Sequence, residues 1–159
     1  MAEITTVEEK LAEVTGLAQA SQGAVDRVTA LVDDQDVTNA LEKMKKEAEE
    51  TEQRCTSIID KREGKKTAIL DKARETKQEA TEMMSTYLDR DSDGLDGLEF
   101  MTMAEAGEVG HWAILGKLSE RTGEAELEEL VDWALPIQER HLAEVREGSL
   151  TLASQVDPE

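Results

Sequence analysis

Apolar side chains recur every three or four residues along most of this chain, a spacing that is typical of helices packed against one another. The spacing predicts a first helix over about residues 5–32, whose apolar stripe is formed by Val7, Leu11, Val14, Ala18, Ser21, Val25, Val28 and Val32. A second helix over about residues 36–63 carries a similar stripe from Val37 to Ile58. Because the connection between them is short, we expect these two helices to be antiparallel neighbours.

Capping residues mark the ends of these two helices. Thr5 and Thr6 are each followed three residues later by a glutamate, which matches the capping box found at helix starts. Asp36 is placed to cap the second helix, and Gly64 is placed to end it.

Three more helices are predicted in the rest of the chain. A weakly patterned helix over about residues 65–88 is expected to pack on the outside as a crossover. Strongly patterned helices follow over about residues 96–120 and 124–153, and Pro136 is expected to bend or bulge the last one. The expected fold is a single all-α domain over residues 1–159, an antiparallel four-helix bundle with an additional outer crossover helix.

Two pairs of polar residues interrupt the apolar stripes of the last two helices. Glu105 and Glu108 lie in one stripe, Gln138 and His141 lie in the other, and a tight turn at Gly123 joins the helices. Counting outward from this turn places Glu108 level with Gln138 and Glu105 level with His141, because each residue advances about 1.5 Å along its helix. A charged group between helices is costly without a partner or a metal ion, so this meeting point is the best functional clue in the chain.

The chemistry of these four side chains suits a divalent metal ion. Carboxylates, an amide oxygen and an imidazole that project inward from facing helices are ligands by which bundles hold iron, manganese or zinc. Glu47 and Glu50, one turn apart on the second helix, lie at a similar height and are candidates to complete the ligand shell. For the first four side chains, the alternative is a network of hydrogen bonds without a metal ion. For Glu47 and Glu50, the alternative is that they belong to a solvated surface.

Charge and cysteine content narrow the choice of partners. The chain has 37 acidic and 18 basic residues and a net charge of −19. This charge disfavours nucleic acid and anionic membranes as partners and favours cations. The single cysteine, Cys55, excludes an internal disulfide and is expected to be a packing residue, and no apolar run resembles a signal peptide or a membrane span. We therefore expect a cytoplasmic protein.

The loop before the fourth predicted helix is similar to the first half of a calcium-binding loop, with Asp89, Asp91 and Asp93 at alternate positions. The twelfth position of such a loop needs a glutamate, but Phe100 stands there. We therefore favour a turn followed by a helix cap at Asp96 over a calcium site.

These motifs resemble the YciF-like branch of the ferritin-like superfamily, which consists of small bacterial bundles associated with stress responses. The resemblance covers nearly the whole chain. It is most specific where Glu105-Ala-Gly-Glu108 and Val109-Gly-His-Trp112 are similar to that family's Glu-x-x-Glu and Ile-x-x-Tyr elements. Glu50-Thr51 is similar to the family's Glu-Thr step, and Glu47 stands where the family usually has histidine.

The resemblance implies a ferritin-like metal-binding protein in bacterial stress response or metal homeostasis. Gln138 replaces the family's carboxylate on the last helix, and the glutamate expected around Ser21 or Gln22 is missing. With fewer carboxylates in register, we expect one or two iron or manganese ions and a non-catalytic or weakly redox-active role. The alternatives are a structural or interaction bundle that forms a homodimer through one helical face, and a di-iron oxidase or ferroxidase.

Overall fold

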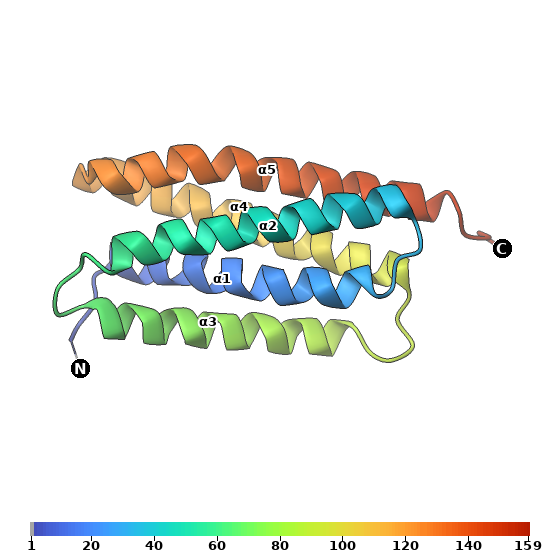
Figure 1. The fold of residues 1–159 in the computed structure, drawn as a ribbon, viewed down its shortest axis with the longest axis horizontal. Helices are drawn as coiled ribbons and strands as arrows, with labels where there is room; N and C mark the ends of the chain where they lie inside the picture. The colour runs from blue at the N-terminus through green and yellow to red at the C-terminus, as the bar shows by residue number, and fades with distance from the viewer. Residues whose placement is uncertain (1) are drawn as a thin grey trace.

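Five long helices account for most of the chain in the computed structural model, which describes residues 2–159 (Figure 1). They are α1 (Thr6–Thr29), α2 (Gln35–Ile59), α3 (Lys66–Tyr87), α4 (Gly94–Thr122) and α5 (Ala125–Ala153). The described residues contain no β-strand, which confirms the predicted all-α class. None of these helices combines the length and the apolar character needed to cross a membrane.

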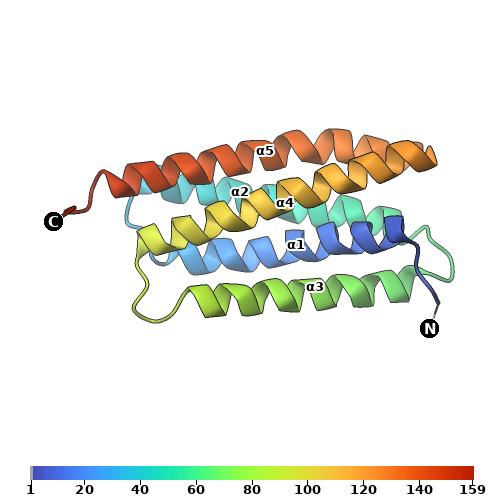
Figure 2. The ribbon, with the colours of Figure 1, turned by 180° about the vertical axis from the view of Figure 1, so that it is seen from behind.

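Four of the helices form a bundle. Helix α1 packs against α2 and α4, and α5 packs against the same two helices, so that the four occupy the corners of a square. Figures 1 and 2 show that neighbouring helices of this square run in opposite directions. Helix α3 packs along α1 and makes much less contact with α2. The predicted helical bundle is therefore confirmed, with one further helix lying against α1.

The first two helices begin at side-chain caps. Thr5 forms the predicted capping box with Glu8, since the backbone N–H of each residue donates to the side chain of the other. The predicted cap at Asp36 is wrong, because Asp34 precedes α2 and its Oδ1 accepts from the Val37 backbone N–H at 3.0 Å. Both α1 and α2 also end three to four residues earlier than predicted.

The cap of α4 also lies earlier than predicted. Asp93, rather than Asp96, is the N-cap, and the two residues bond reciprocally: each side chain accepts from the backbone N–H of the other at 2.9 Å. At the other end of α4, Gly123 adopts a left-handed conformation with φ of 71°, which suits a residue without a Cβ. The expected tight turn into α5 follows. Helix α5 then continues through Pro136, so the missing N–H does not end it.

The apolar core consists of two separate clusters, one toward each end of the bundle. One cluster surrounds Trp112 and includes Leu11 and Ile59. The other includes Leu41 and Met101. Between them, at the middle of the bundle, the buried positions are largely polar: Ser21, Thr51, Glu105, Glu108, Gln138 and His141. We call these six residues the polar layer.

Contact between α1 and α3 depends on one glycine. A Cβ at Gly16 would collide with the Ala73 carbonyl oxygen and would lie 2.9 Å from Thr76 Cβ, so the two helices approach closely only without a side chain there. Gly23, on the same helix, has open space around its Cβ position.

This difference predicts opposite effects of the same substitution. We expect Gly16→Ala to lower the free energy of unfolding by about 1–3 kcal/mol through overpacking. Gly23→Ala, the matched control, should leave it unchanged or raise it by up to about 1 kcal/mol, because alanine favours the helix. Urea unfolding followed by circular dichroism measures both. Equal effects of the two substitutions would contradict the close packing of α3 on α1.

Candidate functional site

Four of the six predicted site residues meet inside the bundle. Glu105 and Glu108 come from α4, Gln138 and His141 come from α5, and their relative exposures are 1%, 4%, 1% and 1%. The four side chains lie on the faces that the helices bury, because they occupy positions of the apolar stripes. They are therefore held in a region from which water is largely excluded.

The contacts between α4 and α5 follow the register expected from the count about Gly123. With its amide nitrogen facing α4, Gln138 donates to Oε2 of Glu108 and to Oε2 of Glu105, at 3.1 Å each. His141 Nδ1 lies 3.8 Å from Glu105 Oε2. The polar side chains of the two helices thus converge at one height.

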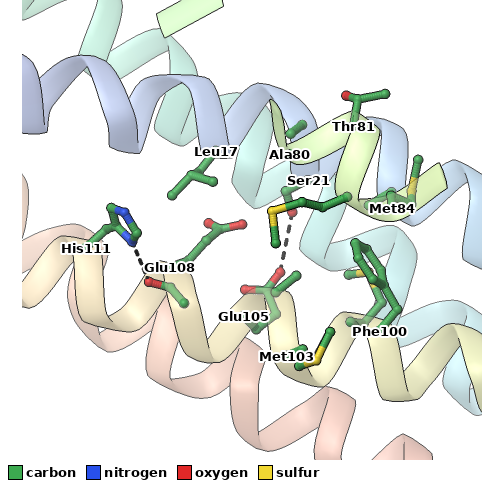
Figure 3. A pocket seen from close by; sticks show the side chains of 16 residues that line it. Leu17, Ser21, Ala80, Thr81, Met84, Phe100, Met103, Glu105, Glu108 and His111 are labelled. Atoms are coloured by element: carbon green, nitrogen blue, oxygen red, sulfur yellow. Dashed lines mark hydrogen bonds between the residues drawn. The ribbon is translucent and has the colours of Figure 1, made fainter. Parts of the chain in front are cut away.

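Helix α1 contributes a hydroxyl to the same group. Ser21 Oγ donates to Glu105 Oε1 at 3.4 Å, across the interface between α1 and α4 (Figure 3). The family resemblance led us to expect a glutamate around Ser21 or Gln22, and the side chain that reaches Glu105 from α1 is that of Ser21. The carboxylate of Glu105 therefore has a neutral partner on this side, in place of a second acid.

Glu47 approaches the group from α2. Its Oε1 is 3.2 Å from His141 Nε2, and both of its carboxylate oxygens accept from the guanidinium of Arg140. Burial raises the pKa of Glu47, but the hydrogen bonds from Arg140 and His141 outweigh this, and the net pKa is lowered. Arg140 also donates to Glu144 Oε1 at 3.3 Å within α5. Its hydrogen bonds to Glu47 link α5 to α2.

Glu50 does not join the group. Its side chain is 51% exposed and accepts from Arg54, one turn further along α2, at 3.0 Å. The expectation that Glu50 completes the ligand shell is therefore corrected. Placing two residues at a similar height does not place both on the buried side of a helix, because three residues turn the helix by less than a full turn.

Burial controls the protonation of the acids. It raises the pKa of Glu105 to about 8 against a lowering contribution from Ser21. Burial, followed by the charge of Glu105, raises the pKa of Glu108 well above its usual value. Burial also lowers the pKa of His141, although Glu47 acts in the opposite direction. At neutral pH the layer therefore holds a neutral imidazole and carboxyl groups that retain protons.

Two buried polar atoms near the layer have no hydrogen-bond partner among the described residues. They are Nε1 of Trp112, one turn after Glu108 on α4, and Oε2 of Glu144, one turn after Arg140 on α5. An unpaired buried polar atom is costly. The hydrogen-bonding capacity of the polar atoms around the layer is thus not fully used in this conformation.

The remaining candidates have local structural roles. Asp89 Oδ1 accepts from the Asp91 backbone N–H at 2.8 Å, and Asp93 caps α4, so these carboxylates are used by the turn and the cap. Cys55 is fully buried in the apolar cluster around Trp112, and burial raises the pKa of its thiol to about 12. This agrees with its expected packing role.

Sequence reasoning did not anticipate the pairing of Arg140 with Glu47. Arg140 stands next to His141, so the sequence does place a cation beside the predicted site, and this adjacency was a usable signal. The partner of Arg140 could not be read in the same way, because it comes from α2, 93 positions earlier in the chain.

The layer is arranged as a hydrogen-bonded network. Within residues 2–159, no three His, Cys, Asp or Glu side chains form a group that could hold a metal ion as they stand. Metal binding would therefore require side chains to rotate. Comparison with protein-family models and with curated proteins found no match to this chain. The chemistry and placement of the layer are therefore the basis on which a function is proposed.

The raised pKa of Glu105 predicts how stability depends on pH. The folded protein keeps a proton on Glu105 up to about pH 8, whereas the ordinary pKa of a glutamate side chain is 4.5. This contribution is complete below about pH 4.5 and is lost as the pH rises through about 8. Relative to Glu105→Gln, the metal-free protein should lose up to ~1.4 kcal/mol of unfolding free energy for each pH unit in that window.

Urea unfolding in the presence of a chelator, from pH 5 to pH 8, measures this difference. Glu120→Gln, an exposed change on the same helix, is the matched control and should show no such trend. A difference between the protein and Glu105→Gln that stays constant with pH would contradict the raised pKa.

Proposed function

We propose that the polar layer binds divalent iron or manganese through Glu105, Glu108, Gln138 and His141. The observation that carries the proposal is the burial of two carboxyl groups side by side with no lysine or arginine in contact with them among the described residues. Such a pair must hold protons or a cation. A divalent cation would replace the protons, and metal affinity would then rise with pH.

The donor set fits this class of metal. Two carboxylates, an imidazole and an amide oxygen are ligands that suit iron and manganese. The Gln138 amide would turn by half a rotation, so that its oxygen rather than its nitrogen faces Glu105 and Glu108. The neutral state of His141 leaves a ring nitrogen available as a ligand. The number of carboxylates supports one ion, or two held weakly.

Arg140 is proposed to change its partner when metal binds. It holds the Glu47 carboxylate in the metal-free arrangement, and Glu47 would join the ligands only after leaving Arg140. Glu144 offers Arg140 another partner, because it already accepts one hydrogen bond from Arg140 and its Oε2 has no other partner among the described residues. Arg140 would thus exchange Glu47 for Glu144 when metal binds.

The arrangement of the helices supports the proposal that this bundle is ferritin-like. Four antiparallel helices enclose inward-facing acid and histidine residues, and α3 lies against α1, where a crossover helix would run. The YciF-like resemblance adds a bacterial, cytoplasmic role in stress response or metal homeostasis to the proposal. The serine at position 21 gives no fourth carboxylate for a bridged di-iron centre, so the proposed role is non-catalytic or weakly redox-active.

A second candidate is a structural or interaction bundle with a metal-free polar core. One observation favours it: the Gln138 amide donates to both carboxyl groups and so satisfies them in part without any ion. A di-iron oxidase is the third candidate, and it would require a carboxylate in place of Ser21.

Metal analysis distinguishes the first two candidates. We expect protein loaded with Mn²⁺ and then desalted to retain metal, and Glu105→Gln combined with Glu108→Gln to retain at least tenfold less. The control combines Glu99→Gln with Glu120→Gln, which removes the same charge from exposed positions of α4. Mn²⁺ at about 100 times its dissociation constant should raise the unfolding free energy by about 2.7 kcal/mol. Equal metal content in all three proteins would support the metal-free core instead.

The role of Arg140 gives a separate prediction. Arg140→Gln removes a positive charge near the ion and releases Glu47, so we expect Mn²⁺ to bind about tenfold more tightly, which corresponds to ~1.4 kcal/mol. Arg146→Gln, an exposed change on α5, is the matched control and should alter the affinity little. Isothermal titration calorimetry measures both. Weaker binding by Arg140→Gln than by the control would contradict the exchange.

A further inference from the structure

A pocket of about 280 Å³ lies between α3 and α4, with residues of α1 between them (Figure 3). The space exists because small residues line it from all three helices: Ala20, Ala24, Ala80, Ala104 and Gly107. Leucine, phenylalanine and methionine side chains form most of the remaining wall. Methionine is flexible and adapts to the shape of a bound molecule, so this wall can accommodate more than one apolar outline.

The polar layer opens into this pocket at one place. Glu105 and Glu108 line the pocket although each is at least nine-tenths buried. Figure 3 shows both carboxyl groups directed into the space beside Leu17 and Ser21. Glu108 has the Gln138 amide as its one hydrogen-bond partner among the described residues, and that bond uses Oε2. Glu108 Oε1 therefore has no hydrogen-bond partner among the described residues, and the side chain lines an apolar pocket.

We propose that this pocket binds a small amphipathic amine, with its apolar body between α3 and α4 and its ammonium group against Glu105 and Glu108. Apolar walls favour an apolar body. An ammonium group can take the place of a proton on the two buried acids, because the carboxylate that results forms a charge-assisted hydrogen bond with it. A cavity of 150 Å³ holds benzene, so the space here suits about ten non-hydrogen atoms.

The chemistry of the pocket favours an amine over an anionic ligand or a neutral alcohol of the same length. An anionic ligand of the same length cannot take the place of a proton on the two acids, and its charge is repelled by a protein of net charge −19. A neutral alcohol would fill the same walls, but its hydrogen bond to a carboxylate lacks the charge of an ammonium. Selectivity for the amine over both is therefore the property that the pocket predicts.

The inference shares Glu105 and Glu108 with the proposed metal site but does not rest on metal binding. It concerns the chelator-treated protein, and the glycine variants that test it leave all proposed metal ligands in place. Failure of amine binding would therefore leave the metal measurements intact, and failure of metal binding would leave the amine measurements intact.

The experiment compares three probes that share an eight-carbon body: n-octylamine, 1-octanol and octanoate. Binding to the full-length, chelator-treated protein is measured by NMR titration at about 0.15 M salt, which screens attraction to the acidic surface. We expect octylamine to bind at least tenfold more tightly than either of the other two. Equal binding of octylamine and octanol would overturn the proposal, because the carboxyl groups would then have no part in recognition.

Two glycines of α4 provide a matched pair of variants. A Cβ at Gly107 or at Gly110 meets no atom within 4 Å, but only Gly107 lines the pocket. Leucine at either position favours the helix, so both variants should fold. We expect Gly107→Leu to weaken octylamine binding at least tenfold and Gly110→Leu to leave it unchanged.

A second variant tests the charged end of the site independently. Glu108→Gln preserves shape and should weaken octylamine at least tenfold while changing octanol binding little. Octylamine binding that survives both Gly107→Leu and Glu108→Gln would place the amine elsewhere on the protein and would overturn the proposal.

Discussion

The burial of two carboxyl groups at the middle of the bundle is the constraint on which the rest of this structure depends. Glu105 and Glu108 lie on the stripe of α4 that packs inward, and they divide the apolar core into two clusters. Apolar packing at each end holds the helices together, and the acids between them cannot withdraw to solvent. They must therefore keep protons, find hydrogen-bond donors or bind a cation.

The residues around these acids lower the free-energy cost of burying them. Gln138, Ser21 and His141 supply neutral partners from α5 and α1, which reduces the penalty of burial without neutralising any charge. Arg140 is bonded to Glu47 and Glu144 at the edge of the layer instead. Among the described residues, the layer thus combines acids that contact no lysine or arginine with an arginine that contacts two other carboxylates. Both features are the basis of the proposed binding role.

Helix existence and helix register were predictable because α-helical geometry is local and regular. The spacing of apolar residues located all five helices, and the count about Gly123 placed Glu108 beside Gln138 and Glu105 near His141. Helix ends were predicted less well. Two or more acidic residues stand near the start of α2 and of α4, and the one that caps each helix depends on small differences in backbone conformation.

The sequence by itself determined the bundle, its polar layer and the height at which that layer lies, since rise per residue and apolar period belong to each helix alone. Only the tertiary structure decided which side chains around the layer take part. Glu47 faces His141 while Glu50 faces solvent, and Arg140 finds its partner on α2. The pocket beside Glu108 likewise depends on how far α3 stands from α4. These features follow from the rotation and separation of helices distant in the chain, which the local period of one sequence does not specify.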